Sequence, residues 1–223
     1  MKERPIIFTA DSVRAILDGQ KIMTRRVVKP QPALGGNAPW MNGGWFPNAK
    51  HKKARHYANE SHFKKGMPKD FCPYGIPGDR LWVKEVWWDA FRRTADENGC
   101  VYKADYGHRM DLTEYMAEGQ PWKSPRFMFR WASRIMLELT AIRLERVQDI
   151  SEEDAQAEGC MEDVRLIYDS AGPAAPVDYE GLYAAERFSD LWEKINGKHG
   201  FGWNVNPWVW VLEFKLVVLE GTS

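Results

Sequence analysis

The sequence has few cysteines and no long apolar run. Its three cysteines, at positions 72, 100 and 160 of 223 residues, are widely spaced and odd in number, which fits a reducing compartment better than a disulfide framework. No stretch approaches the roughly 18 apolar residues of a membrane-spanning helix, and the first residues lack the apolar core of a signal peptide. We therefore expect a cytoplasmic protein that has no membrane partner.

The sequence also has no net charge. Lysine plus arginine and aspartate plus glutamate number 31 each, so attraction to nucleic acid would have to come from a local patch. The hydrophobic content of 44% is ample for a buried core, and we expect one domain over residues 1–223. Tryptophan is abundant, at eleven residues, and so large a side chain needs either a deep core or a flat ligand to stack on.

Hydrophobic periodicity predicts both strands and helices. A short N-terminal strand leads into a helix that Thr9 or Asp11 can cap and that Gly19 ends. A second helix opens with Ser151 as its N-cap and three acids in its first turn, and it ends at Gly159. Strands separated by helices of uneven length favour an α+β fold with a curled sheet or a small barrel. The other predicted elements are strands over 5–8, 81–87, 101–106, 134–147 and 208–218 and a helix over 179–195.

Residues 30–78 have little periodicity and many Gly, Pro and Asn residues, which we interpret as a long inserted loop region. Basic and aromatic residues are interleaved there and face almost no acid apart from Glu60. Cations can track phosphates while aromatic faces stack on unpaired bases, so the composition suits single-stranded nucleic acid. The alternative is a solvated basic loop that packs its aromatic rings on its own domain. The candidate nucleic-acid-binding residues are Lys50, Lys52, Lys53, Arg55, Lys64 and Lys65.

The same segment contains His51, His56, His62 and Cys72, which are acceptable zinc ligands. Their irregular spacing matches no zinc module, so the sequence predicts no metal site. The glycine pairs at 35–36 and 43–44 lack the strand, helix and lysine of a phosphate-binding loop. We therefore predict no cofactor.

Lys21 and Thr24 form the most informative pattern, directly after the first predicted helix. Burial favours the neutral form of an amine, and a neutral amine can act as the base for a neighbouring hydroxyl. Arg25 and Arg26 follow and could hold an anion such as a phosphate. Positions three apart in a regular strand point to opposite faces, so the two side chains converge only if the backbone turns or bulges after Gly19. Otherwise Thr24 is an ordinary strand residue and Lys21 a solvated residue beyond a helix end.

Four segments carry motifs that can be compared with known families. They are Gly19-x-Lys21-x-x-Thr24-x-Arg26, the Gly78-Asp79 turn, the run Asp149-Ile150-Ser151-Glu152-Glu153-Asp154-Ala155, and the closing Asn206-Pro207-Trp208-Val209-Trp210-Val211-x-Glu213-Phe214. Together they resemble the ASCH domain family of the PUA-like superfamily. The longer layout is similar to ASCH proteins carried by tailed phages and prophages. For a phage-encoded protein, the expected location is the cytoplasm of the host cell.

The resemblance implies a PUA-like small β-barrel surrounded by helices, with a cleft suited to RNA or a modified pyrimidine nucleoside. One bacterial branch of the family is an amidohydrolase that splits N4-acetylcytidine into cytidine and acetate, and it uses a lysine, a threonine and a glutamate. By motif, these catalytic residues correspond to Lys21, Thr24 and Glu158. Taken without the family, Glu158 would be an acid on the surface of a helix.

Four further residues are candidates for substrate binding: Arg25 and Arg26, together with Trp82 and Lys84, which alternation places on one face of a strand. The amidohydrolase branch is much shorter and lacks the basic, aromatic insertion, so two other functions stay open. One is a non-catalytic module that binds RNA or modified bases. The other is an ASCH-type ribonuclease in which Lys21, Arg25 and Arg26 hold the phosphate. The sequence predicts no particular oligomeric state.

Overall fold

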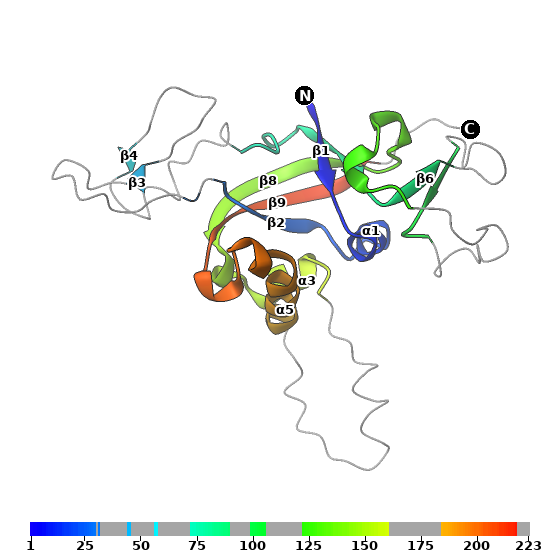
Figure 1. The fold of residues 1–223 in the computed structure, drawn as a ribbon. Helices are drawn as coiled ribbons and strands as arrows, with labels where there is room; N and C mark the ends of the chain where they lie inside the picture. Colours follow the sequence, from blue (N-terminus) through cyan, green and yellow to red (C-terminus); the bar gives the residue numbers. More distant parts are fainter. Residues whose placement is uncertain are drawn as a thin grey trace, which may run out of the picture. The chain divides into compact units, whose positions relative to one another are not determined.

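The computed structural model describes residues 1–29, 31, 44–45, 56–57, 72–89, 99–105, 122–160 and 184–217 (Figure 1). Within them the α-helices are α1 (Ala10–Leu17), α3 (Glu152–Ala157) and α5 (Ala184–Asn196). The strands are β1 (Glu3–Ile7), β2 (Met23–Val27), β3 (Gly44–Trp45), β4 (His56–Tyr57), β5 (Arg80–Lys84), β6 (Trp87–Asp89), β7 (Cys100–Tyr102), β8 (Met136–Arg146) and β9 (Trp208–Val217). This mixture confirms the α+β class predicted from the sequence.

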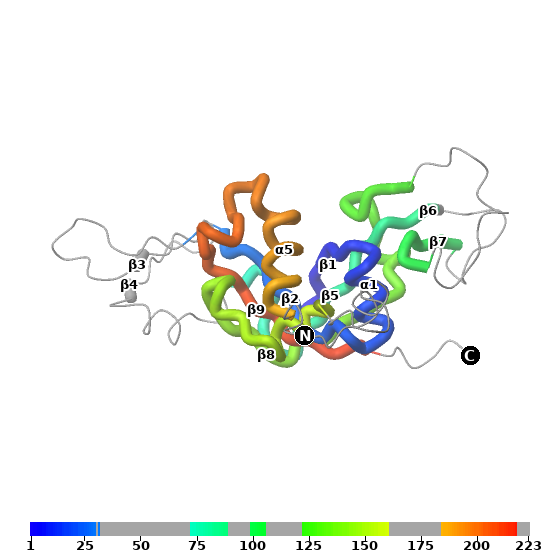
Figure 2. The backbone as a smooth tube through the Cα atoms, turned by 90° about the horizontal axis from the view of Figure 1, so that it is seen from below, coloured from blue at the N-terminus to red at the C-terminus, as the bar shows by residue number. Residues whose placement is uncertain are grey.

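Five of the strands form one sheet in the order β1-β5-β8-β9-β2. β1 is parallel to β5, and β5 is antiparallel to β8. The long strands β8 and β9 are neighbours and run side by side (Figure 2). Most neighbours in this order are distant in sequence, so the sheet depends on long-range pairing. The closure of the sheet into a small barrel stays a prediction.

The chain divides into two compact units. Unit 1 comprises Met1–Ile22, Cys72–Ala141 and Glu213–Ser223, and unit 2 comprises Met23–Phe71 and Ile142–Leu212. The expectation of a single domain over residues 1–223 stays a prediction. The six candidate basic residues between Lys50 and Lys65 lie outside the described residues.

In unit 1, α1 begins and ends where the sequence predicts. The Thr9 hydroxyl accepts a hydrogen bond from the Ser12 amide (3.3 Å) and so caps the helix. Val13 and Ile16 are buried on one face. Gly19 follows with a φ of 73°, a left-handed conformation that glycine adopts without strain.

The turn before β5 is tied to the N-terminal strand by a buried carboxylate in the same unit. Asp79 accepts hydrogen bonds from the Lys2 amide and from the Arg4 guanidinium, both at 2.7 Å. Burial alone would raise the pKa of Asp79, but these donors and the charge of Arg4 outweigh it and hold the pKa below its usual value. The predicted Gly78-Asp79 turn therefore anchors the start of β5.

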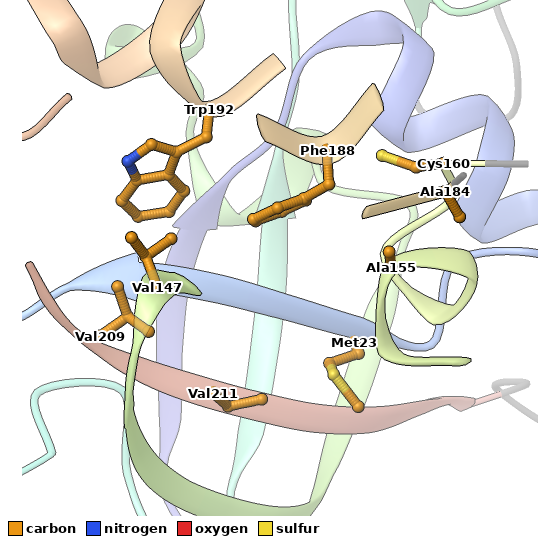
Figure 3. Close-up of a cluster of buried hydrophobic side chains, with 9 residues drawn as sticks. All are labelled: Met23, Val147, Ala155, Cys160, Ala184, Phe188, Trp192, Val209 and Val211. Atoms are coloured by element: carbon orange, nitrogen blue, oxygen red, sulfur yellow. The ribbon is translucent and has the colours of Figure 1, made fainter. Parts of the chain in front are cut away.

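In unit 2, residues of α3 and α5 form a buried core with residues of β2 and β9 and with Val147, which follows β8. Ser151 caps α3 by accepting a hydrogen bond from the Asp154 amide (3.2 Å), as predicted. Phe188 and Trp192 extend from α5 toward Val147 and Val209 (Figure 3). The buried cluster contains Met23, Val147, Ala155, Cys160, Ala184, Phe188, Trp192, Val209 and Val211.

The predicted strand over 81–87 is interrupted in the structure. β5 ends at Lys84 and β6 begins at Trp87. Glu85, between them, is 1% exposed. Its backbone amide donates to the Met128 sulfur at 3.3 Å, and its carboxylate pairs with Arg134 at 3.0 Å inside the protein. The predicted alternation is confirmed for Trp82 and Lys84, because the Lys84 ammonium lies 5.4 Å from the centre of the Trp82 ring.

Two predicted elements differ from the structure in their bounds. The strand predicted over 101–106 is wrong beyond Tyr102, where the chain enters a turn. Of the helix predicted over 179–195, α5 accounts for the part from Ala184, and residues 179–183 lie outside the described residues. None of the helices that the structure describes is long and apolar enough to cross a membrane.

Replacing the α3 cap should lower stability. We expect Ser151→Ala to reduce the free energy of unfolding by about 1 kcal/mol, because the Asp154 amide loses its acceptor. Urea unfolding followed by circular dichroism measures this. Ser189→Ala, inside α5, is the matched control and should be neutral or slightly stabilising, since alanine is the better helix former. Equal losses in the two variants would contradict the capping role.

Candidate functional site

The three residues assigned by motif to catalysis are all withdrawn from water. Lys21 is 5% exposed, Thr24 4% and Glu158 6%. Lysine and glutamate are almost never buried without a partner, so the alternatives of a solvated lysine and a helix-surface glutamate are wrong. Lys21 belongs to unit 1, whereas Thr24 and Glu158 belong to unit 2.

The backbone turns sharply before Lys21, as a site using Lys21 and Thr24 requires. After Gly19, the amides of Gln20 and Lys21 both donate to the Ala15 carbonyl oxygen at 2.9 Å. The chain therefore folds back on the end of α1 and does not enter β2 as a regular strand. The bend that the sequence left as a condition is present.

β2 carries its polar residues on both sides. Met23 and Arg25 share one side, because an Arg25 nitrogen lies 3.4 Å from the Met23 sulfur. Thr24, between them, faces the other side by strand alternation. Both sides are covered, since Met23, Thr24 and Arg25 are all buried.

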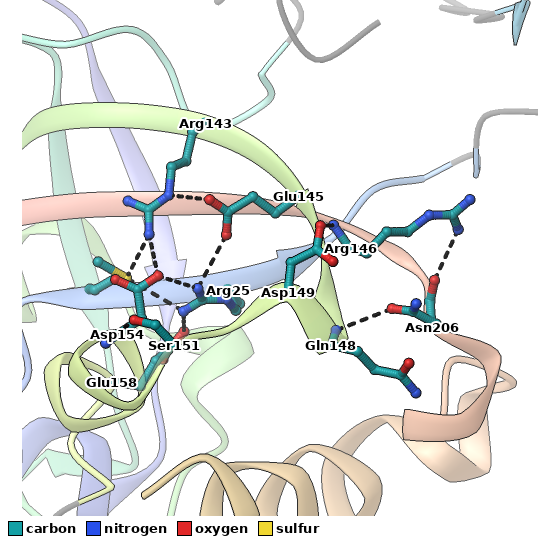
Figure 4. A network of polar contacts seen from close by, with 11 residues as sticks. Arg25, Arg143, Glu145, Arg146, Gln148, Asp149, Ser151, Asp154, Glu158 and Asn206 are labelled. Atoms are coloured by element: carbon teal, nitrogen blue, oxygen red, sulfur yellow. Dashed lines mark hydrogen bonds and ion pairs between the residues drawn. The ribbon is translucent and has the colours of Figure 1, made fainter. Parts of the chain in front are cut away.

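Arg25 is surrounded by carboxylates from β8 and from α3 and its C-cap residue, in an arrangement we call the Arg25 cluster (Figure 4). One guanidinium nitrogen lies 2.6 Å from Asp154 and 3.2 Å from Glu145. The other terminal nitrogen lies 3.6 Å from Glu158. Arg143 pairs with both Glu145 and Asp154 and closes the network. The cluster consists of Arg25, Arg143, Glu145, Asp154 and Glu158.

This arrangement changes the role expected for Arg25. Its side chain has no exposed surface, and it is already paired with carboxylates. It has therefore no open face for a substrate anion, and it positions Glu158 and Asp154 within the protein. Arg26, the next residue along β2, is half-buried and faces the opposite side of the strand by alternation.

The charges of the Arg25 cluster shift the pKa of one member. Burial would raise the pKa of Asp154, but hydrogen bonds and charge from Arg25 and then Arg143 outweigh it, so its pKa lies below the usual value. Asp154 is thus committed to the ionised form at neutral pH. Glu158, at the C-cap of α3, is held by Arg25 at a longer distance.

A second buried charge network, in unit 1, was missed by the sequence analysis. Arg134 donates two hydrogen bonds to Glu85, at 3.0 and 3.2 Å, and another to Asp105. Its guanidinium carbon lies 3.9 Å from the centre of the Tyr102 ring. Burial raises the pKa of Glu85, although Arg134 offsets part of the effect. Every charge is paired, which is typical of a structural network, and no local spacing could have revealed it.

Removing Arg25 should destabilise the protein strongly. We expect Arg25→Ala to lower the free energy of unfolding by about 3–5 kcal/mol, because buried carboxylates would lose their cation. The exposed Lys194 of α5 provides the control: Lys194→Ala should change stability by about 0.5 kcal/mol or less. Chemical unfolding of both variants measures the difference, and a small effect of Arg25→Ala would contradict the structural role.

Stability should also depend on the ionisation of Asp154. A carboxyl whose folded pKa is lowered stabilises the fold at pH values above its ordinary pKa of 3.8, and the contribution is lost as pH falls through the folded pKa. We therefore expect Asp154→Asn to be clearly less stable than wild type near about pH 6, with the gap narrowing near about pH 3. Urea unfolding at both pH values tests this. The exposed Asp190→Asn should show no comparable pH-dependent gap.

Comparison of the chain with family models, curated proteins and solved structures finds no match.

Proposed function

We propose that the protein is a PUA-like ASCH domain that recognises RNA or a modified pyrimidine nucleoside and hydrolyses the N4-acetyl amide of cytidine. One observation carries the proposal: Lys21, Thr24 and Glu158, the residues that the motifs assign, are all 6% exposed or less. An amine, a hydroxyl and a carboxylate withdrawn from water cost free energy to bury. Such groups are concentrated at functional sites.

The chemistry gives each of the three groups a role, and Glu158 acts first as an acid and then as a base. The Thr24 hydroxyl attacks the acetyl carbonyl while the Lys21 amine takes its proton. The bond between the carbonyl carbon and N4 breaks, and the Glu158 carboxyl gives a proton to the leaving cytidine nitrogen. Glu158, now a carboxylate, then takes a proton from water, which attacks the acetyl-threonine ester. The ester bond breaks, the Lys21 ammonium returns its proton to the Thr24 oxygen, and acetate is released. The sum is N4-acetylcytidine plus water giving cytidine plus acetate.

The Arg25 cluster supports the role given to Glu158. Arg25 holds Glu158 at 3.6 Å but holds Asp154 at 2.6 Å. The shorter contact commits Asp154 to the ion pair, and the longer one fixes the position of the Glu158 side chain. A general acid needs both a fixed position and an accessible proton.

The ribonuclease alternative has less support. It requires Arg25 to hold a phosphate, and the Arg25 side chain has no exposed surface and pairs with Asp154 and Glu145. The binding-module alternative is compatible with a buried polar set that recognises a base edge without turnover. It differs from the hydrolase only in whether cytidine is released.

The decisive experiment incubates the purified protein with N4-acetylcytidine and measures cytidine and acetate by chromatography. We expect release, and a loss of at least about 100-fold in Lys21→Met, Thr24→Val and Glu158→Gln, because each removes a group that moves a proton or forms a bond. Lys29→Met and Thr140→Val, at exposed positions, are matched controls and should retain activity.

Circular dichroism and urea unfolding establish that each variant is folded. Binding of N4-acetylcytidine without turnover would replace the hydrolase by the binding module. Turnover that survives in the folded Lys21→Met or Thr24→Val variant would show that the proposed roles are wrong.

A further inference from the structure

Unit 1 contains a pocket that the proposed hydrolysis does not use. Its volume is about 780 Å³, and it lies between the β5–β6 segment and residues 122–129. Among the residues that the structure describes, its lining includes the cations Lys84, Lys123 and Arg126 and no carboxylate. Its other lining residues are chiefly aromatic. A pocket with this composition attracts a flat, negatively charged ligand.

Aromatic rings stand exposed beside the cations. Phe127, Phe129 and Trp131 are 72%, 61% and 51% exposed. The Phe129 and Trp131 rings are stacked, with an interplanar angle of 10° and centroids 6.3 Å apart. Large apolar side chains that are exposed next to one another often mark an interaction site.

The exposed rings belong to a firmly anchored segment. Met128 and Ala132 alternate with them and are buried in a cluster with Trp87 and Tyr102. The Trp131 ring meets the buried Trp87 ring edge-on at 6.0 Å. Because these buried contacts hold the segment in place, the exposed rings are already ordered before a ligand binds.

The cations are also held in place. The Lys84 ammonium donates to the Arg126 carbonyl oxygen at 2.7 Å and lies near the Trp82 ring. The Lys123 ammonium lies 4.9 Å from the centre of the Trp87 ring. Arg130, in contrast, pairs with Glu3 at 2.9 Å. These contacts fix where the Lys84 and Lys123 ammonium groups lie, whereas the charge of Arg130 is offset by Glu3.

We propose that this surface binds single-stranded nucleic acid, with bases stacked on Phe127, Phe129 and Trp131 and phosphates held by Lys84, Lys123 and Arg126. Stacked aromatic faces next to cations accept any unpaired base and its phosphate. An acidic peptide would satisfy the cations but not the flat rings, and a duplex hides its base faces. This inference shares with the proposed function only the class of ligand, a nucleic acid or its bases. It does not depend on hydrolysis. It also specifies a ligand for Lys84, which the sequence analysis gave as a candidate for substrate binding: a phosphate group of the strand.

The test measures binding of the full chain to fluorescently labelled RNA and DNA strands of about 12 nucleotides, and to the corresponding duplexes, by anisotropy. We expect the single strands to bind more tightly than the duplexes. Phe129→Ala with Trp131→Ala should weaken single-strand binding by about 5- to 100-fold. The RNA and DNA arms identify which strand is preferred.

Salt dependence tests the cations separately. Lys123→Ala with Arg126→Ala should reduce the slope of log affinity against log salt by about 1.4, since each phosphate contact on a single strand contributes about 0.7. Lys194→Ala with Lys198→Ala removes the same charge from exposed positions elsewhere and should leave the slope and affinity nearly unchanged.

The two proposals can fail independently. Lys21→Met should retain strand binding, and the Phe129 and Trp131 variant should retain turnover of free N4-acetylcytidine. Unchanged strand affinity in the folded aromatic variant would overturn the pocket assignment. So would equal losses in the control pair, or an absence of strand binding, which would leave these rings as a protein-docking surface.

Discussion

The buried guanidinium of Arg25 is the interaction on which the candidate site depends. It comes from β2 and meets carboxylates from β8 and from α3 and its C-cap, so it fixes these three segments of unit 2 to one another. Burying a charge is costly, and the cost is offset only when several partners surround it with good geometry. Any change in the position of α3 would therefore separate a buried ion pair. This makes the location of Glu158 at the end of α3 a rigid feature.

The carboxylates of the Arg25 cluster differ in how closely they pair with arginine. Two arginines face three carboxylates, so the group cannot be fully neutralised from within. Asp154 makes the shortest contact with Arg25 and also pairs with Arg143, and its lowered pKa makes it a poor proton carrier. Glu158 has the longer contact with Arg25. Asp154 is therefore committed to the ion pair, and under the proposed function the proton transfers fall to Glu158.

Local features of this chain were predictable, and long-range ones were not. The Ser151 cap, the turn after Gly19 and the shared face of Trp82 and Lys84 follow from rules that act within a few residues. The pairing of Arg25 with Asp154 spans 129 positions, and nothing in β2 alone distinguishes an arginine for phosphate from an arginine for carboxylate. Likewise, where the predicted strand is interrupted, the Glu85 amide donates to Met128, 43 positions later, and its carboxylate pairs with Arg134, 49 positions later.

The tryptophans illustrate why composition leaves function open. Eleven residues could have served a core or a ligand, and the structure divides them: Trp87, Trp192 and Trp208 are 4% exposed or less, while Trp131 is half exposed. Trp87 also supports Trp131 from below, so a buried ring contributes to the order of an exposed one. A stacking platform tolerates any base, whereas a buried amine, hydroxyl and acid select one bond. Under the two proposals made above, the exposed rings would supply affinity for any unpaired base, and the buried polar residues would supply selectivity for one modified base.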